Sequence, residues 1–367
     1  MQTTPKLQRP PSHVHYNIAM NPGKQTSLID KVQSSILELE PGALSAPLVL
    51  MVSGGSDSVA LLCLVHRIAI DAWGNADNLL VAHVNHQLRG PEALADEAFV
   101  LSLCEELGIE CQVESTAVAA LAARSQQSVE QIGRTVRYDF ARKLLADFSL
   151  RRNQRHQGFI LTAHTANDRA ETLLQRLIVG AGTGSLASIP WSNDRILRPL
   201  LDCSRQELRD WLTAQNLAVN GCLWREDATN LDTTYSRAFV RHELIPLLAK
   251  RNPRIVEGLN RTAELLSAED AWLDEQAAQL LPLWRDSFSA PLPLLRRAIY
   301  LACNAAIQEL APAARITFEH VELIARAGSE DGFACQIPGG IEVRNIKGEL
   351  VFKKAKPPQH DPRKTGS

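Results

Sequence analysis

The chain has 367 residues, of which 45% are hydrophobic and 22% charged, and its formal net charge at pH 7 is -2. This length can bury the cores of two domains, and the near-zero charge leaves recognition of an anionic partner to local basic patches. Seven cysteines without C-x-x-C spacing argue against a disulfide scaffold or a zinc ribbon, and no apolar stretch reaches the roughly 18 residues of a membrane span.

The first 27 residues hold four prolines and no acidic residue, a composition that predicts a disordered arm. Organelle transit peptides also lack acids, although the prolines and the few basic residues argue against an amphipathic one. The scattered cysteines favour a reducing compartment. We therefore expect a cytoplasmic protein, with an organelle stroma left open if the arm is a transit segment.

Short apolar runs then alternate with helical patterns. Helices are expected, for example, at 92–107 and 129–148. Such alternation predicts an α/β fold with a parallel, Rossmann-like sheet and helices on both faces. Ligands of these sheets bind beyond the carboxyl ends of the strands. The candidate strands are 48–52, 79–84, 110–114 and 159–163.

The pattern becomes mostly helical after residue 198, with helices expected at 205–215 and 233–249. The segment "CQIPGGIEVRNIKGELVF" predicts a hairpin-like pair of short strands. We therefore expect an α/β domain over 28–245, a mainly helical domain over 246–354 that ends in a β hairpin, and a disordered tail over 355–367.

The turn after the first predicted strand combines glycines with hydroxyl groups and one acid. Its glycines let the backbone approach an anion closely, and the amides that follow lie at a helix N-terminus, which favours phosphate. Asp57 beside a phosphate suggests help in holding Mg²⁺. A capped turn without a ligand is the alternative. The turn consists of Ser53, Gly54, Gly55, Ser56, Asp57 and Ser58.

This S-G-G-x-D-S turn resembles the pyrophosphate loop of the ATP pyrophosphatases, which cleave ATP between the α and β phosphates. Further segments resemble one family among them, the tRNA(Ile)-lysidine synthetases, over about residues 45–355. Four positions depart from that family's pattern, namely Thr165, Asn167, Arg169 and Ala238, and their roles stay open. The matching segments are "VAHVNHQLRG", "EQIGRTVRYDF", "TAHTANDRAETLLQRLIVGAGTGSLASI", "REDATNLDTTYSRAFVRHELIPLL" and "FACQIPGGIEV".

The resemblance implies that ATP and Mg²⁺ serve to join free lysine to C2 of the first anticodon cytidine, residue 34, of tRNA(Ile) with a CAU anticodon. That change would shift codon reading from AUG to AUA. It implies catalytic roles for Asp57, Arg134, His164, Asp168 and Glu171, and nucleotide binding by the loop with His83. It also implies substrate binding by Asp168, Glu171, Arg137, Arg237 and Arg241. The domain over 28–245 would then be the catalytic domain, and the domain over 246–354 would bind tRNA.

Two acids lie at i and i+3, where a helix is expected to begin near Asn167. Asp168 and Glu171 would share one face, and such a pair could bind the ammonium of lysine and accept a proton. Favourable acids at a helix N-terminus are the alternative explanation. Arg134 and Arg137 also share a helical face, either towards phosphate or as a solvated basic surface.

Histidines follow the second predicted strand. His83, His86 and Arg89 are expected to contact ATP or RNA, and no third ligand is spaced for zinc. Residues 124–155 hold eight basic against three acidic residues, and residues 237–254 hold five against one, so both segments are candidates for contact with tRNA phosphates. Tyr138 and Tyr235 are candidates for stacking the target cytosine, although core packing is the alternative for both.

Two other functions stay open: another tRNA-modifying enzyme with this loop, such as a thiolase, and a non-catalytic nucleotide- or RNA-binding module. The lack of C-x-x-C counts against the thiolase, and the retained acids and Arg134 count against the binding module. A homodimer is possible.

Overall fold

The computed structural model describes residues 27–355 except 126, 154–157, 216–217, 220, 227–235, 282–283 and 313. Contacts divide the chain into two compact units between Glu264 and Leu265, within one helix. The sequence-based boundary lies earlier, between residues 245 and 246. The predicted arm and tail lie outside the described residues, except for residues 27 and 355. Tyr235 also lies outside them.

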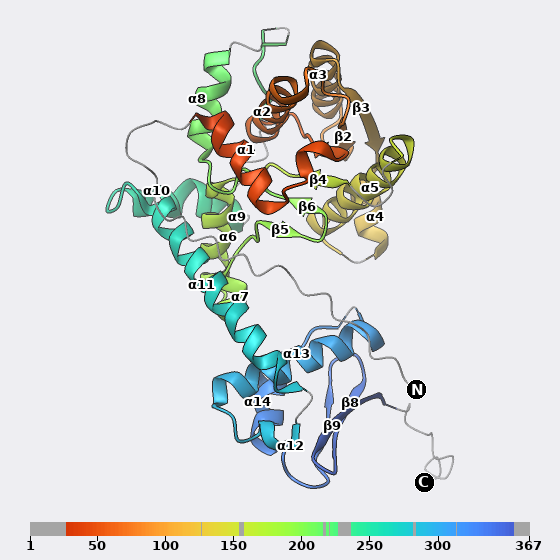
Figure 1. The fold of residues 1–367 in the computed structure, drawn as a ribbon, viewed down its shortest axis with the longest axis vertical. Coiled ribbons are helices and arrows are strands. Elements are labelled where there is room, and N and C mark those ends of the chain that lie inside the picture. The colour runs from red at the N-terminus through yellow and green to blue at the C-terminus, as the bar shows by residue number, and fades with distance from the viewer. Residues whose placement is uncertain are drawn as a thin grey trace, which may run out of the picture. The chain divides into compact units, whose positions relative to one another are not determined.

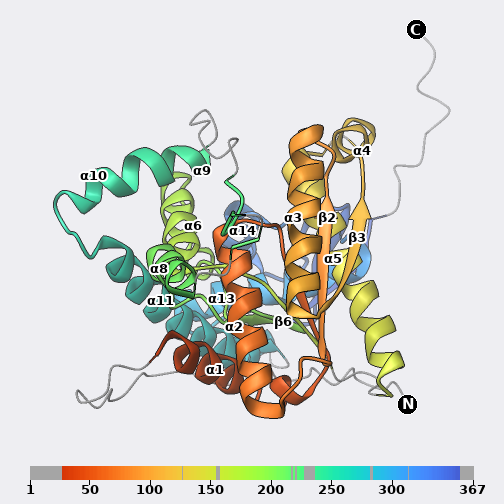
Figure 2. The same cartoon turned by 90° about the horizontal axis from the view of Figure 1, so that it is seen from above.

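The N-terminal unit contains a six-stranded sheet with helices (Figures 1 and 2). Its strands are β1 (Leu48–Met51), β2 (Leu79–Asn85), β3 (Glu110–Ser115), β4 (Phe159–Leu161), β5 (Ser192–Asn193) and β6 (Ile196–Leu197). Its longer helices are α1 (Leu28–Leu39), α2 (Ser56–Trp73), α3 (Pro91–Leu107), α4 (Val118–Ser125), α5 (Val129–Arg151), α6 (Ala166–Ile178) and α8 (Arg205–Gln215).

Short elements complete this unit. They are a 3₁₀ turn (Ala43–Ser45), α7 (Thr183–Leu186), α9 (Ser236–Phe239), a π-helical stretch (Val240–Leu244), α10 (Ile245–Ala249) and the start of α11 (Ile255–Ala278). Over residues 236–249, the described part of the helix expected at 233–249, the chain forms α9, the π-helical stretch and α10 in succession.

The strand order is β3-β2-β1-β4-β6-β5, parallel except for the antiparallel edge pair β5–β6. The predicted parallel sheet is confirmed, and the four predicted strands are found within a few residues. β5 and β6 were not predicted because two residues are too short to show a periodicity. The chain moves to one side of β1 for β2 and to the other for β4, so the loops after β1 and β4 diverge at a topological switch point.

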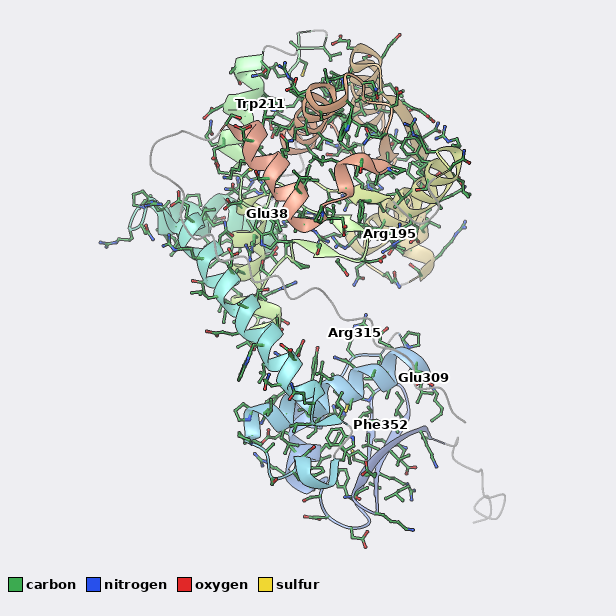
Figure 3. The ribbon with its side chains drawn as sticks, in the orientation of Figure 1. Glu38, Arg195, Trp211, Glu309, Arg315 and Phe352 are labelled. Atoms are coloured by element: carbon green, nitrogen blue, oxygen red, sulfur yellow. The ribbon has the colours of Figure 1, made fainter. Side chains whose placement is uncertain are left out.

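Alternate strand residues enter two separate cores, which explains the uninterrupted apolar runs of the strands. Leu48 and Leu50 pack with α1, α2, α3 and α8, whereas Val49 packs with α5. Helices therefore cover both faces of the sheet, as expected. In Figure 3, Trp211 marks α8, and its side chain packs against the first of these cores.

The C-terminal unit packs helices against a small antiparallel sheet. Phe352 of its last strand, labelled in Figure 3, packs on this core. Antiparallel pairing is found in the segment predicted as a hairpin-like pair, but the segment forms three strands joined by two turns, ordered β7-β8-β9. The elements are α12 (Trp284–Ser287), α13 (Leu292–Leu310), α14 (Phe318–Ala327), β7 (Ala334–Ile337), β8 (Ile341–Ile346) and β9 (Glu349–Lys354). Over the described ranges of both units, no helix combines the length and apolarity needed to cross a bilayer.

Candidate functional site

The glycine-serine turn links β1 to α2 at the carboxyl edge of the sheet. Gly54 has φ +93°, a left-handed conformation that favours glycine, and Gly55 is the N-cap of α2. The Ser58 hydroxyl donates to the Gly55 carbonyl over 2.9 Å and accepts from the Ser53 amide over 3.2 Å. The turn is therefore tied internally by a hydroxyl, with the first amides of α2 at its open side.

A second segment meets the turn at this edge, where β4 leads into α6. Thr165 is the N-cap of α6, and its hydroxyl and amide each donate to Asp168 Oδ2 over 2.9 Å. This capping box aims the other Asp168 oxygen away from the helix. Glu171 lies one turn further and is 1% exposed. Thr165 thus acts as a cap, and the helix begins at Ala166, close to the predicted start.

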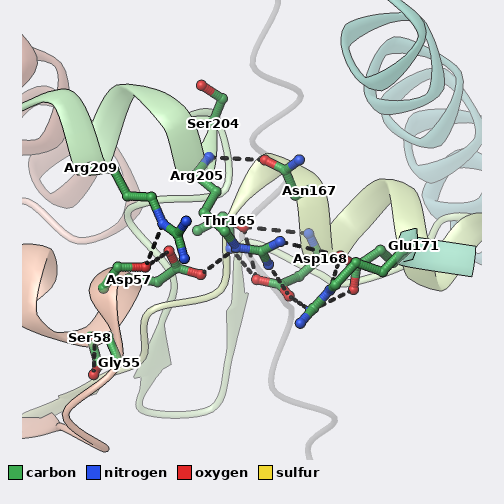
Figure 4. A network of polar contacts seen from close by, with 12 residues as sticks. Gly55, Asp57, Ser58, Thr165, Asn167, Asp168, Glu171, Ser204, Arg205 and Arg209 are labelled. Atoms are coloured by element: carbon green, nitrogen blue, oxygen red, sulfur yellow. Dashed lines mark hydrogen bonds and ion pairs between the residues drawn. The ribbon is translucent and has the colours of Figure 1, made fainter. Parts of the chain in front are cut away.

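Arg205, the first residue of α8, joins the two segments (Figure 4). Its Nε donates to Asp57 Oδ2 over 3.0 Å, and its Nη2 donates to Asp168 Oδ1 over 3.3 Å. Nη1 lies 3.5 Å from Glu171 Oε1. The Arg205 amide also donates to Asn167 Oδ1 over 2.9 Å. Asn167 therefore binds the first amide of α8.

Two further arginines reach the same acids from α9 and the π-helical stretch. Arg241 Nε and Nη2 donate to the two oxygens of Glu171 over 2.7 and 2.8 Å. Arg237 Nη2 donates to Asp168 Oδ1 over 2.9 Å, and its Nε to Glu171 Oε2 over 3.2 Å. Three carboxylates, Asp57, Asp168 and Glu171, thus meet three guanidinium groups, and we call these six residues the acid cluster.

The pKa values of two acids in the acid cluster are shifted in opposite directions. Burial raises the pKa of Asp57 above its ordinary value, although Arg205 opposes the shift. Burial would also raise the pKa of Asp168, but the charges of Arg205 and Arg237 outweigh it, so this pKa is lowered. Asp168 is therefore a firmly ionised group at neutral pH, suited to holding a cation.

A second group of side chains, which we call the cation cluster, consists of Arg134, Tyr138, His164 and Arg198. The Arg134 guanidinium lies 4.7 Å from the centre of the Tyr138 ring, and Arg198 bonds to the Tyr138 side chain. Arg198 is 3% exposed and donates to the Pro190 carbonyl over 2.8 Å. Within the described ranges, neither arginine of this cluster forms an ion pair, and the Arg198 Nε has no hydrogen-bond partner.

His164 follows β4, and its Nδ1 lies 2.9 Å from the Thr162 hydroxyl. Burial lowers its pKa to about 4; Asp168 opposes this shift, and the charges of Arg198, Arg237 and Arg134 add to it. The ring is therefore neutral near pH 7. Tyr138 is a residue of α5 and is buried between this helix and the sheet, so core packing, the alternative stated for it, is confirmed.

The remaining predicted residues lie around these two clusters. Arg137 donates from Nε to the Gly133 carbonyl over 3.4 Å. His83 is 3% exposed, with Nδ1 2.9 Å from the Val52 carbonyl; a nucleotide contact by His83 stays a prediction. His86 packs on Gly133, and burial lowers its pKa to about 4. Arg89 pairs with Asp96 over 2.9 Å.

Sequence reasoning missed the arginines of α8. Arg209 lies one turn after Arg205, and its Nε donates to the Ser56 hydroxyl over 3.2 Å (Figure 4). It stacks 5.5 Å from the Trp224 ring and pairs with Glu226 over 3.2 Å. The i, i+4 spacing on a predicted helix was the available signal, but it is equally typical of a solvated face.

The open position Arg169 is buried in α6. Its guanidinium lies 5.7 Å from the Trp191 ring and 3.8 Å from Glu264. These contacts indicate a packing role. Ala238 lies in α9, directly after Arg237.

The loop is also tied to a distant strip of chain. The Arg225 amide donates to the Gly54 carbonyl over 2.9 Å, and the Arg225 side chain pairs with Asp96 over 2.9 Å. A Cβ at Gly54 would lie 3.5 to 3.7 Å from Val100, Arg225 and Phe99. The turn is therefore closely packed on its outer side.

The described residues contain no group of three or more His, Cys, Asp or Glu side chains that could hold a metal ion by themselves. Mg²⁺ in nucleotide sites is usually bound by one or two carboxylates together with phosphate oxygens and water. Asp57, beside the loop, fits that limited demand.

Basic side chains lie exposed on α4 and α5, as the charge count predicts. Some are paired: Arg142 with Asp139 over 3.2 Å, and Arg151 with Glu110 over 2.9 Å. Arg155 lies outside the described residues. The exposed basic residues of these helices are Arg124, Arg134, Arg137, Arg142, Lys143 and Arg151.

Comparisons with known proteins agree with this architecture. The model of the PP-loop domain family matches residues 28–248. The chain is 36% identical over 321 residues to a tRNA(Ile)-lysidine synthase of Thermus thermophilus, covering 85% of this chain and 57% of that protein.

Two further relatives carry the same name. One, from Geobacter sulfurreducens, is 34% identical, with 83% of this chain and 64% of that protein covered. The other, from Deinococcus deserti, is 40% identical, with 68% and 43% covered. The chain thus spans roughly half of these relatives' lengths. This family match covers more than half of the chain and includes the turn at 53–58, and it shows that the chain belongs to the PP-loop domain family.

Proposed function

We propose that this chain is a tRNA(Ile)-lysidine synthase, acting in the cytoplasm, which uses ATP to attach lysine to the anticodon cytidine of tRNA(Ile). The observation that carries the proposal is the acid cluster. Asp168 and Glu171 are buried acids suited to binding an amine. Both contact Arg205, which also binds Asp57 of the phosphate-binding turn. The names of the relatives support the same assignment.

The first step needs donors and cations around the α phosphate. The C2 oxygen of the cytidine attacks this phosphorus, and pyrophosphate leaves with the electron pair of the broken P–O bond. Amides at the start of α2 bind the leaving pyrophosphate. Asp57 is the residue that would hold Mg²⁺, which supplies charge neutralisation of phosphate oxygens when bound. Arg134 and His164 adjoin the switch point and are assigned to the adenylated intermediate.

The second step brings lysine to C2, and AMP leaves. Asp168 and Glu171 bind the ammonium and orient it. Its proton then passes to water, the amine nitrogen bonds to C2, and the bond from C2 to the AMP oxygen breaks. The lowered pKa of Asp168 suits it to hold the cation rather than to accept the proton. Arg137, Arg237 and Arg241 are assigned to substrate binding. The exposed basic residues of α4 and α5 are assigned to contacts with phosphates of the anticodon stem.

The test is transfer of radiolabelled lysine in the presence of ATP and Mg²⁺ to tRNA(Ile) with a CAU anticodon, with tRNA(Met) of the same anticodon as control. We expect label in tRNA(Ile) alone, with one AMP and one pyrophosphate formed per lysine. Sulfur transfer without lysine would replace the proposal by a thiolase, and ATP binding without any transfer would replace it by a binding module.

A further inference from the structure

The two acids assigned to lysine have no oxygen without a donor. Asp168 Oδ2 accepts from Thr165, and Oδ1 accepts from Arg237 and Arg205. Glu171 Oε1 meets Arg241 and Arg205, and Oε2 meets Arg241 and Arg237. An ammonium carries three donors and no acceptor, so it can bind here only by replacing a guanidinium group.

The distances rank the three arginines. Arg241 forms a bidentate pair with Glu171 at 2.7 and 2.8 Å, and Arg237 reaches Asp168 at 2.9 Å. Arg205 contacts the same two acids only at 3.3 and 3.5 Å. Its shortest contact, 3.0 Å, is to Asp57 instead. Arg205 is therefore held least by the acid pair, since bidentate and short charge-assisted bonds are the strong ones.

Arg205 also lies next to the turn at which phosphates are expected to bind. Asp57 is the second residue of α2, in the first turn, where the phosphate-binding amides lie. A bound triphosphate brings several negative charges to this point, next to the Arg205 guanidinium. Phosphate oxygens accept from arginine in the same bidentate way as carboxylates do.

We propose that Arg205 occupies the place of the lysine amine in the empty enzyme and moves to the phosphates when ATP binds. The lysine ammonium then takes Asp168 Oδ1 and Glu171 Oε1, the two oxygens that Arg205 leaves. Formal charge in the cluster stays at zero, because one cation replaces another. Arg205 thus makes lysine binding conditional on bound nucleotide.

The inference rests on the proposed function, because it takes lysine as the substrate. It predicts positive coupling between the two ligands. Couplings between sites are typically about 5- to 150-fold, and they are reciprocal. We expect lysine to bind at least about tenfold more tightly to the nucleotide-bound chain, and lysine to tighten nucleotide binding by the same factor.

The experiment is calorimetric titration of lysine into the full chain, with and without a saturating ATP analogue that has a methylene group between the α and β phosphorus atoms. The variants are Arg205→Gln and the matched control Arg209→Gln, which lies one turn along α8 and contacts Ser56 but neither acid. We expect Arg209→Gln to keep the coupling. Arg205→Gln should bind lysine without nucleotide and show less than about twofold coupling.

Equal affinity of the wild-type chain for lysine with and without the analogue would overturn the inference while leaving the proposed function intact. So would full coupling in Arg205→Gln. Failure of lysine to bind the nucleotide-loaded wild type would also reject it, and the label-transfer assay would then show whether the proposed function fails too. The wild-type comparison needs no variant, so it holds even if Arg205→Gln does not fold.

Discussion

The acid cluster and the cation cluster lie at the same edge of the sheet but differ in how their charged groups are paired. In the acid cluster each buried carboxylate has an arginine within 3.5 Å, and the charges cancel. In the cation cluster Arg134 and Arg198 adjoin a neutral histidine, and the described residues provide no ion pair for either arginine.

The contrast shows what each region has in place before a ligand arrives. A balanced cluster binds a cation only by exchange, whereas an unbalanced group of arginines gains from any incoming anion. Asp168 connects the two, because its charge acts on His164 as well as on the arginines. Substitutions should therefore have different consequences for stability in the two regions.

The largest effect is expected for Glu171→Gln in the acid cluster. Glu171 is almost fully buried, and its loss removes the bidentate partner of Arg241 and leaves Arg237 with Asp168 alone. Removing one partner of a buried ion pair costs about 3–5 kcal/mol, and denaturant unfolding would measure the loss. The control is Glu257→Gln, whose exposed pair with Arg254 should contribute less than about 1 kcal/mol. Equal effects at the two sites would show that the acid cluster is not energetically coupled.

A smaller, pH-dependent effect is expected for His164→Gln. The His164 pKa is lowered to about 4 in the folded chain, so between pH 6.5 and 4 the unfolded chain binds the extra proton. This residue therefore contributes nothing at pH 7.5 and destabilises the fold as the pH falls below 6.5. The wild type should lose roughly 1–2 kcal/mol more than the variant between pH 7.5 and 5, measured by unfolding at both values. Parallel losses would mean that the His164 ring is not held neutral.

The smallest effect on stability is expected for Arg198→Met. This substitution removes a buried charge without leaving a carboxylate unpaired, and methionine fills similar space. We expect the free energy of unfolding to change by less than about 1 kcal/mol, while affinity for the ATP analogue falls. Comparison with Glu171→Gln sharpens the contrast directly. A loss as large as that of Glu171→Gln would remove the distinction between the two clusters.

Much of the fold could be predicted because its signals are local. The turn at 53–58, the four predicted strands and helix 205–215 all leave periodic or compositional marks. The edge pair β5–β6 and the third strand of the C-terminal sheet did not, because two-residue strands and closely spaced turns give no period to count.

The site was predicted in part for the same reason. Asp168 and Glu171 were paired by their spacing on one helix, and the loop by its glycines. Their saturation by arginines depends on residues tens of positions away: Arg205, Arg237 and Arg241 lie on other elements. A spacing rule within one helix carries no information on such partners, so the arginine partners of the acid pair had to come from the three-dimensional arrangement.

The bond from the Arg225 amide to the Gly54 carbonyl has its own consequence. A peptide unit is flat and trans, so fixing the direction of one carbonyl turns the amide of Gly55 to the opposite side. Arg225, which is remote in sequence, thereby fixes the direction of the Gly55 N–H in the turn at 53–58. This bond uses only main-chain atoms, so it depends on the identity of residue 225 in one respect: proline has no amide hydrogen to donate.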